Sequence, residues 1–115
     1  CGLSMGGFHT LNISLNYPDM FNYSGMFSAA IGVSDPSISP MYQDMDTKIA
    51  TYFSKKPALL WIGCGDTDFL IQANRDFVKK LQDGGYPHTY YENDGGHIWR
   101  NWRIYFTEFV PLIFK

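Results

Sequence analysis

Ser4 lies between two glycines at a spacing that is typical of a nucleophilic serine. Gly2, Ser4 and Gly6 form the pattern G-x-S-x-G within the first seven residues, CGLSMGG. In such a nucleophile elbow the serine occupies a sharp, strained turn from a strand into a helix, and small residues on both sides let the neighbouring backbone approach. The turn also aims the backbone N–H of Met5 at the place where an oxyanion would form. Because glycine and serine are common in loops, the pattern needs support from the rest of the chain.

Two polar turns farther along the chain contain a candidate acid and a candidate base. Asp68 lies in the turn 65–68 and His97 lies in the glycine-rich turn 93–97, and each turn follows an apolar run of strand length. A serine hydroxyl is a poor nucleophile at neutral pH, so a histidine must take its proton and later return it to the leaving group. An acidic side chain holds that histidine in the required tautomer. The chain order Ser, Asp, His is that of α/β-hydrolases and differs from the other two well-known triad orders.

Other side chains compete for the roles of acid and base. Asp66 lies in the same turn as Asp68, and we prefer Asp68 because its position in G-x-x-D lets the side chain reach back over the edge of the sheet. Asp66 then shapes the turn by binding its own backbone. Asp94 is so close to the histidine in sequence that we expect it to shape that turn as well. His9 lies in the helix after the serine, where we expect a packed or surface role because a general base normally comes from a separate loop.

Helices and strands alternate along the chain. Apolar residues at helical spacing predict amphipathic helices, and short apolar runs predict strands. We expect parallel strands at about 24–30, 58–64 and 88–92, and helices over 7–17, from 46 or 47 to 53, over 71–82 and over 99–114. The fold class is therefore α/β, with three parallel strands and flanking helices. Because functional groups in such sheets lie at the carboxyl ends of the strands, the three polar turns are expected to meet at that edge.

Two further expectations concern a loop and the start of the domain. The segment Gly32 to Met45 is rich in Ser, Pro and Asp and predicts a loop over one face of the sheet, either facing a substrate or simply connecting two elements. A hydrophobic strand should precede Gly2, and no such run is present in the sequence. We therefore expect residues 1–115 to form the C-terminal half of one larger catalytic domain.

The two cysteines are expected to be free and buried. Cys1 and Cys64 both fall at predicted strand ends. If one strand lies between them, they are roughly 10 Å apart, which is too far for a disulfide.

Length and composition limit the functions open to the chain. It has 115 residues, of which 45% are hydrophobic and 17% aromatic, enough for one modest core. The formal net charge is −2 and basic residues form only short pairs, Lys55–Lys56 and Lys79–Lys80, which we expect on solvated surface. Nothing therefore favours nucleic-acid binding. No apolar run has the length of a membrane span. The three histidines and two cysteines do not have the spacing of a zinc site.

Three stretches together resemble a known family. GLSMGG (2–7), GCGDTDFL (63–70) and GGHIWRNWRIYFTEFVPLIF (95–114) are similar to the esterase D-type family of α/β-hydrolases. Its members include feruloyl and acetylxylan esterases acting on plant cell-wall carbohydrate, S-formylglutathione hydrolase and mycolyltransferases. The resemblance spans the whole chain, and the pattern G-H-x-W-x-x-W-R is most similar to the carbohydrate-esterase branch found in gut bacteria.

The resemblance implies a function and a set of site residues. Ser4 matches the nucleophile, Asp68 the acid and His97 the base of a serine carboxylic-ester hydrolase that works through an acyl-enzyme, with no metal and no organic cofactor. The implied substrates are feruloyl or acetyl esters of plant cell-wall carbohydrate, and the implied location is secreted or periplasmic. Trp99 could line a pocket for an aromatic acyl group, and it could equally be a core or helix-start tryptophan.

The same resemblance implies that half of the domain is missing from this sequence. It implies five earlier strands and a second oxyanion-hole N–H from that half. We therefore expect residues 1–115 alone to be insoluble, associated or inactive. Two alternative functions stay open, namely thioester hydrolysis or acyl transfer with the same triad, and a non-catalytic carbohydrate-binding module. The intact Ser–Asp–His set argues against the latter.

Overall fold

A parallel sheet of four strands forms the centre of the computed structural model, which describes residues 1–32 and 42–114. The strands follow one another across the sheet in chain order, as β1 (Gly2–Leu3), β2 (Tyr23–Phe27), β3 (Leu59–Gly65) and β4 (Thr89–Asn93). Every neighbouring pair is parallel. The carboxyl ends of all four strands therefore meet at one edge of the sheet.

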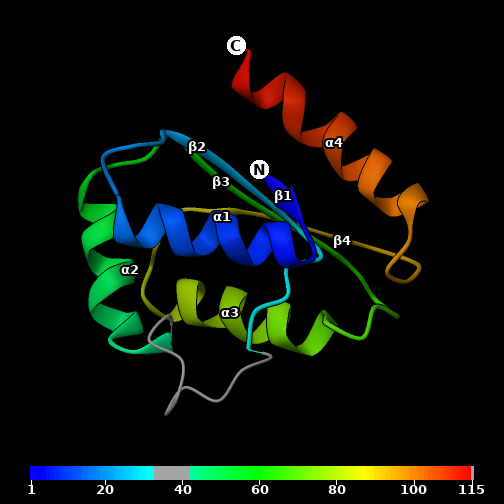
Figure 1. The fold of residues 1–115 in the computed structure, drawn as a ribbon, viewed down its shortest axis with the longest axis horizontal. Coiled ribbons are helices and arrows are strands. Elements are labelled where there is room, and N and C mark those ends of the chain that lie inside the picture. Colours follow the sequence, from blue (N-terminus) through cyan, green and yellow to red (C-terminus); the bar gives the residue numbers. More distant parts are fainter. Residues whose placement is uncertain (33–41, 115) are drawn as a thin grey trace.

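Four helices cover the two faces of this sheet: α1 (Met5–Asn16), α2 (Met45–Ser54), α3 (Ile71–Asp83) and α4 (Trp99–Ile113). The first three each connect two successive strands, and right-handed crossovers in a sequential sheet place such helices on the same face. Figure 1 shows α1, α2 and α3 together on one side of the strands and α4 on the other.

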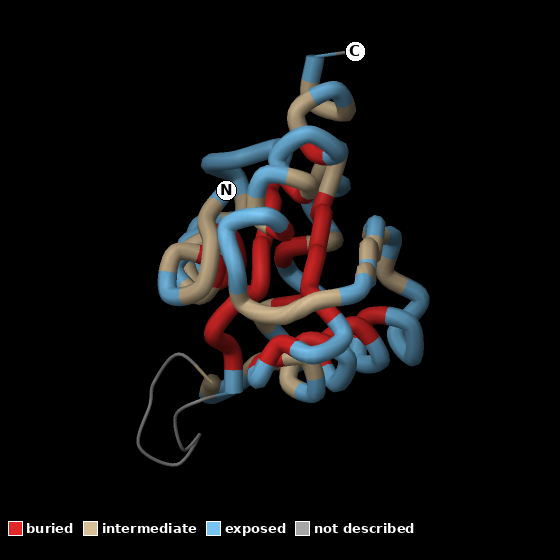
Figure 2. The backbone as a smooth tube through the Cα atoms, turned by 90° about the vertical axis from the view of Figure 1, so that its right-hand side faces the viewer, coloured by how far each residue is buried: buried red, intermediate tan, exposed pale blue. Residues whose placement is uncertain are grey.

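Neighbouring residues of each strand pack on opposite faces of the sheet. In β3, Leu60 and Ile62 belong to a mainly aliphatic core with α1, α2 and α3, whereas Trp61 belongs to an aromatic core with α4. The aromatic core consists of Phe27, Trp61, Tyr105 and Phe109. Figure 2 shows the resulting pattern, with the central strands β2 and β3 largely buried in the middle and the outer turns of the helices exposed.

The predicted α/β class with parallel strands is confirmed, but the sheet contains four strands where three were expected. A strand was expected to precede Gly2, whereas β1 consists of Gly2 and Leu3 themselves, which lie in a glycine-rich turn and form no apolar run. Gly2 and Leu3 pair with Met26 and Phe27 of β2. The second strand also ends at Phe27, three residues before the predicted end, because Ser28 has a positive φ of 48° and turns the chain out of the strand.

The helix boundaries differ most at the amino ends. The first helix begins at Met5, directly after the serine turn, where the sequence predicts a start at residue 7. The second begins at Met45, and the residue before it, Asp44, has a left-handed conformation and makes no side-chain cap. The start predicted at residue 46 or 47 is therefore one or two residues too late. The predictions for α3 and α4 differ by one residue at the carboxyl end, and most of the loop predicted over 32–45 lies outside the described residues.

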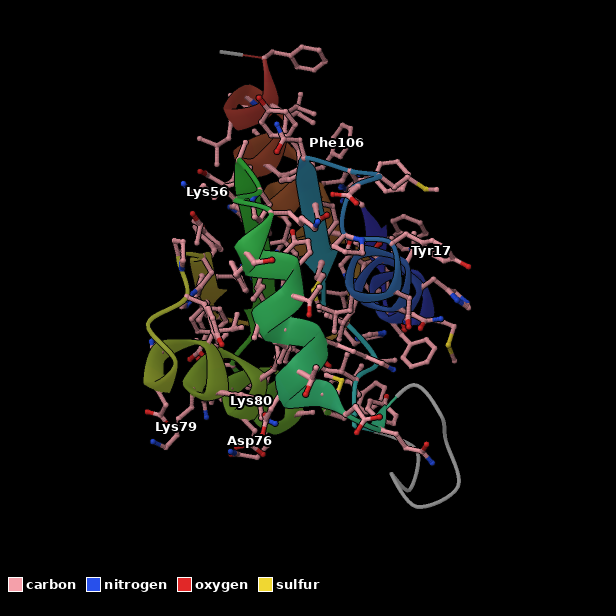
Figure 3. All side chains as sticks on the ribbon, turned by 90° about the vertical axis from the view of Figure 1, so that its left-hand side faces the viewer. Tyr17, Lys56, Asp76, Lys79, Lys80 and Phe106 are labelled. Atoms are coloured by element: carbon pink, nitrogen blue, oxygen red, sulfur yellow. The ribbon has the colours of Figure 1, made fainter. Side chains whose placement is uncertain are left out.

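The charged side chains of α3 face outward, as expected for the short lysine pairs. Lys80 contacts Asp46 at 2.8 Å and Lys79 contacts Asp83 at 3.3 Å. Figure 3 shows Asp76, Lys79 and Lys80 on the outer side of α3. None of the helices in the described part of the chain is both long and apolar enough to cross a bilayer.

Both cysteines are free, as expected, since β2 lies between the strands that contain or adjoin them. Cys64 is buried but Cys1 is exposed, so the expectation of two buried thiols is wrong for Cys1. Burial raises the pKa of the Cys64 thiol to about 12, which keeps it protonated at neutral pH.

Candidate active site

Ser4 occupies a strained turn between β1 and α1. Its φ is 54° and its ψ is −117°, a conformation that a residue with a side chain rarely adopts. Backbone hydrogen bonds hold it there: the Ser4 N–H donates to the Phe27 carbonyl at 2.8 Å, and the Ser4 carbonyl accepts from the N–H groups of Gly7 at 3.0 Å and Ala30 at 2.9 Å. The turn is therefore tied to the end of β2 as well as to the first turn of α1.

Close backbone packing requires glycine at two positions around Ser4. A Cβ on Gly2 would overlap the carbonyl of Gly6, and a Cβ on Gly7 would lie 2.7 Å from the Cβ of Ala29. A Cβ on Gly6 would meet no atom within 4 Å among the described residues. A small residue was expected to be required two positions after the serine, at Gly6. The structure requires it three positions after the serine, at Gly7.

Ser4, Asp68 and His97 form one continuous chain of hydrogen bonds. His97 Nε2 lies 3.0 Å from Ser4 Oγ, and His97 Nδ1 lies 2.8 Å from Asp68 Oδ2. The Asp68 side chain is fully buried, whereas 21% of the His97 side chain is exposed. The remaining carboxylate oxygen, Asp68 Oδ1, accepts the Leu70 N–H at 2.9 Å. The three residues come from turns far apart in sequence, and their catalytic roles stay predictions.

The direction of these hydrogen bonds follows from the chemistry of the partners. An ionised carboxylate only accepts, so the proton on the neutral imidazole belongs on Nδ1, facing Asp68. That leaves Nε2 as an acceptor for the hydroxyl proton of Ser4. This is the tautomer that a general base for Ser4 requires.

Asp66 joins the two turns on either side of the site. Its Oδ1 accepts the Gly95 N–H at 3.1 Å, and the neighbouring Thr67 N–H donates to the Gly95 carbonyl at 3.0 Å. A Cβ on Gly65 would overlap the Gly95 carbonyl, so this close approach requires glycine. Asp66 thus stabilises a turn, as expected. It was expected to bind the backbone of its own turn, 65–68, but it binds the backbone of the turn 93–97.

The other two candidates lie away from the Ser4–His97 contact. Asp94 is exposed and forms a long ion pair of 3.6 Å with Arg100. His9 is exposed on α1, with its ring 5.6 Å from that of Phe8. Both observations fit the structural roles expected for them.

Two aromatic rings contact His97. The centroid of the Phe69 ring lies 4.9 Å from that of His97, and the Trp102 ring meets it edge to face at 5.0 Å. Trp102 Nε1 also donates to Ser28 Oγ at 3.1 Å. Neither residue was predicted to contact the site, although each has a signal in the sequence: Phe69 directly follows Asp68, and Trp102 is the second tryptophan of G-H-x-W-x-x-W-R.

Trp99 is the first residue of α4 and does not belong to the core. It is 66% exposed, and its ring lies 5.1 Å from Trp102. It lines an apolar pocket of about 400 Å³ together with Leu3, Phe27 and Phe106. The structure therefore fits a helix-start tryptophan, and the substrate-binding role stays a prediction.

Met5 is the first residue of α1. The first N–H groups of a helix have no partner within the helix and lie at the positive end of its dipole. This position is suited to a developing negative charge next to Ser4. Among residues 1–32 and 42–114, no three His, Cys, Asp or Glu side chains lie close enough together to hold a metal ion.

A family model and known proteins match most of the chain. A model of the family described as "Putative esterase" matches residues 1–113. The chain is 27% identical to an acetyl esterase of Caldicellulosiruptor saccharolyticus, covering 90% of the chain and 49% of that protein. It is 28% identical to an endo-1,4-beta-xylanase/feruloyl esterase of Xylanibacter ruminicola, covering 99% of the chain and 14% of that protein.

Solved structures share the fold. An S-formylglutathione hydrolase from Staphylococcus aureus matches 97% of the chain and 49% of its own length, with a TM-score of 0.76 and 23% identity. The predicted likeness to part of an α/β-hydrolase fold is thereby confirmed. The chain spans about half the length of the acetyl esterase and of this hydrolase.

Proposed function

The chain belongs to the esterase family whose model matches residues 1–113, and we propose that it contains the catalytic triad of a serine carboxylic-ester hydrolase. One observation carries the proposal. Asp68, His97 and Ser4 are joined by hydrogen-bond distances of 2.8 Å and 3.0 Å in the order that base-assisted nucleophilic attack requires.

In the acylation half-reaction, Ser4 Oγ attacks the carbonyl carbon of the ester. The hydroxyl proton passes to His97 Nε2, and Asp68 stabilises the imidazolium through Nδ1. The carbonyl oxygen becomes an oxyanion, and the Met5 N–H donates a hydrogen bond to it. As the bond between carbonyl carbon and alcohol oxygen breaks, His97 gives its proton to that oxygen. An acyl-serine and a free alcohol result.

Deacylation repeats these steps with water. His97 Nε2 takes a proton from water while the water oxygen attacks the acyl-serine carbonyl. Collapse of the second tetrahedral intermediate breaks the bond to Ser4 Oγ, and the proton on His97 returns to that oxygen. The products are a carboxylic acid and the regenerated serine.

We propose feruloyl or acetyl esters of plant cell-wall carbohydrate as the substrates. The names of two relatives, an acetyl esterase and a xylanase/feruloyl esterase, support this class. The apolar pocket beside Trp99 and Phe106 has the aromatic lining suited to a phenolic acyl group. Activity on feruloylated and acetylated xylo-oligosaccharides tests the assignment.

A second candidate is hydrolysis of a thioester by the same triad, which the likeness to an S-formylglutathione hydrolase favours. Both reactions proceed through an acyl-serine, so the leaving group distinguishes them. Comparing kcat/KM for S-formylglutathione with that for an ester of matched acyl group separates the two. Product analysis with competing alcohols identifies acyl transfer.

We also propose that residues 1–115 are the C-terminal part of one catalytic domain. The match to about half of the acetyl esterase supports this. The other part would supply the second oxyanion-hole donor and cover the free side of β1. Co-expression of this chain with the preceding segment of the full-length protein should then give soluble esterase activity that the chain alone lacks.

Labelling of the full-length protein with a fluorophosphonate probe tests the central proposal. We expect one probe per chain, attached to Ser4 and identified by peptide mass spectrometry. Prior replacement of Ser4 by Ala should abolish labelling, while replacement of the exposed Ser54 on α2 should not. Absence of labelling at Ser4 in a folded wild-type protein would contradict the serine mechanism.

A further inference from the structure

A buried amide lies beneath the turn that contains His97. Asn101, in the first turn of α4, has an exposed fraction of 0%. Its Nδ2 donates to the carbonyl of Gly96, the residue directly before His97, at 2.9 Å. Its Oδ1 accepts from Nδ2 of Asn93, the last residue of β4, at 3.0 Å. One side chain therefore connects the helix, the end of the strand and the turn between them.

A second buried group extends this connection into the aromatic core. The hydroxyl of Tyr105, whose exposed fraction is also 0%, donates to Asn93 Oδ1 at 2.7 Å. Tyr105 contacts Trp61 with ring centroids 5.7 Å apart. Hydrogen bonds thus run from the core through Tyr105, Asn93 and Asn101 to the Gly96 carbonyl.

Two glycines leave the space that this amide fills. A Cβ on Gly65 would lie 2.9 Å from Asn101 Nδ2, and a Cβ on Gly95 would lie 3.0 Å from the same atom. Gly95 also has a φ of 109°, a conformation that favours glycine. The turn that contains Asp68 and the turn that contains His97 thus each have a glycine where a side chain would collide with the Asn101 amide.

A turn rich in glycine needs such an external support. Gly95 and Gly96 have no side chains to pack and lose more conformational entropy on ordering than other residues. His97 directly follows them, so movement of the Gly96 peptide changes the distance from Nε2 to Ser4 Oγ. An error of about 1 Å in a catalytic geometry can cost roughly a hundredfold in rate.

We propose that Asn101 is a positioning residue that sets the reach of His97 to Ser4 by fixing the Gly96 carbonyl. The proposal rests on the proposed esterase function. It also explains the residue type, because a neutral amide can donate to one partner and accept from the other. A carboxylate at this position would lack the donor for Gly96 and would face its carbonyl with negative charge.

Replacement of Asn101 by Asp in the full-length protein tests this role. We expect kcat to fall about a hundredfold with KM changed less than about threefold, because the reacting groups are displaced while the binding surface is kept. The rate of fluorophosphonate labelling of Ser4 should fall in parallel, since it needs the same contact. The matched control is Asn16→Asp, an exposed amide at the end of α1, which should change neither rate.

A gentler variant covers the case in which Asn101→Asp does not fold. Tyr105→Phe keeps the buried ring and removes only the hydroxyl that orients Asn93. We expect about a three- to tenfold fall in kcat and a shifted or broadened low-field proton NMR signal of His97 Nδ1–H, at an unchanged KM. A purely structural role would lower the melting temperature and leave kcat and this signal unchanged.

The outcomes separate the two proposals. If wild-type Ser4 is not labelled, the proposed function fails. If wild-type Ser4 is labelled, and folded Asn101→Asp and Tyr105→Phe proteins both react at the wild-type rate, only the positioning role is overturned.

Discussion

The two faces of the sheet are covered by different kinds of side chain. The face under α1, α2 and α3 is mainly aliphatic, with Leu11, Ile49, Ile62 and Leu81 among its most buried side chains. The face under α4 is aromatic, and its members also form hydrogen bonds, as Tyr105 does with Asn93.

Both faces bury polar side chains, and on the three-helix face Asn74 donates to the Ala29 carbonyl at 3.0 Å. On the α4 face, however, the polar groups belong to aromatic side chains that reach the turns of the candidate site. Aliphatic groups stabilise a face without directing any particular group, because the hydrophobic effect has no direction. Tyrosine and tryptophan contribute buried area and a hydrogen-bond donor whose direction is defined. Trp102 both contacts the His97 ring and donates to Ser28. We therefore expect the α4 face to affect catalysis and the three-helix face to affect stability alone.

The largest expected loss of activity is at the carboxyl ends of the strands, where the candidate site lies between the two faces of the sheet. Ser4→Ala in the full-length protein should lower kcat about 10⁶-fold, since loss of a triad nucleophile has costs of that order. Steady-state hydrolysis of an ester substrate measures it, and Ser54→Ala on α2 is the matched control. Substantial residual turnover in a preparation free of wild-type protein would contradict the assignment of Ser4.

The two carboxylates of the turn after β3 should differ by orders of magnitude. Asp68→Asn removes the acceptor that selects the His97 tautomer, and kcat should fall about 10⁴-fold. Asp66→Asn keeps an oxygen that can accept the Gly95 N–H, so most activity should remain. The ratio of the two kcat values is the measurement, and a larger loss for Asp66→Asn would reverse the assignment.

A core substitution on the three-helix face should separate stability from catalysis. Leu81, on α3, is fully buried, and Leu81→Ala should lower the free energy of unfolding by about 2–5 kcal/mol. Urea unfolding measures this loss, and kcat at a temperature where the variant is folded should stay within about twofold of wild type. A fall in kcat as large as that of Asn101→Asp would break the proposed contrast between the faces.

The smallest effect concerns an ion pair at the outer strand. Arg75 donates to both carboxylate oxygens of Glu92, at 3.0 Å and 2.7 Å, and this partner, followed by the Tyr90 hydroxyl, lowers the pKa of Glu92. Because the pKa of Glu92 is lower in the folded protein than its usual value of 4.5, the ionised side chain stabilises the folded state at pH values above 4.5. This contribution is lost as the pH falls through the folded-state pKa.

Urea unfolding of wild type and Glu92→Gln at pH 7 and pH 3 tests this sign. Wild type should be slightly more stable at pH 7, the difference should shrink at pH 3, and kcat should be unchanged. Tyr90→Phe serves as a partial variant, because it removes one hydrogen bond to the Glu92 carboxylate and keeps the two from Arg75. A stability difference that grows at low pH would contradict the direction of the pKa shift.

The sequence alone determined the order of the elements and the three polar turns. The apolar run 58–64, the polar turn 65–68 and the glycine-rich turn 93–97 constrain the local backbone directly. They predict parallel strands whose carboxyl ends share one edge, and the turns with Ser4, Asp68 and His97 do meet there. The strand expected before Gly2 is the two-residue β1, Gly2–Leu3, and its position was not predicted because so short a segment has no period.

Only the tertiary structure determined which partner each side chain at that edge binds. Asp66 and Asp68 are chemically identical and two residues apart, and the structure directs one carboxylate to Gly95 and the other to His97. Asn101 occupies a space left by glycines from two different turns, which no local pattern encodes. Local sequence limits the backbone of each turn, whereas the partner of a side chain depends on segments that only folding brings together.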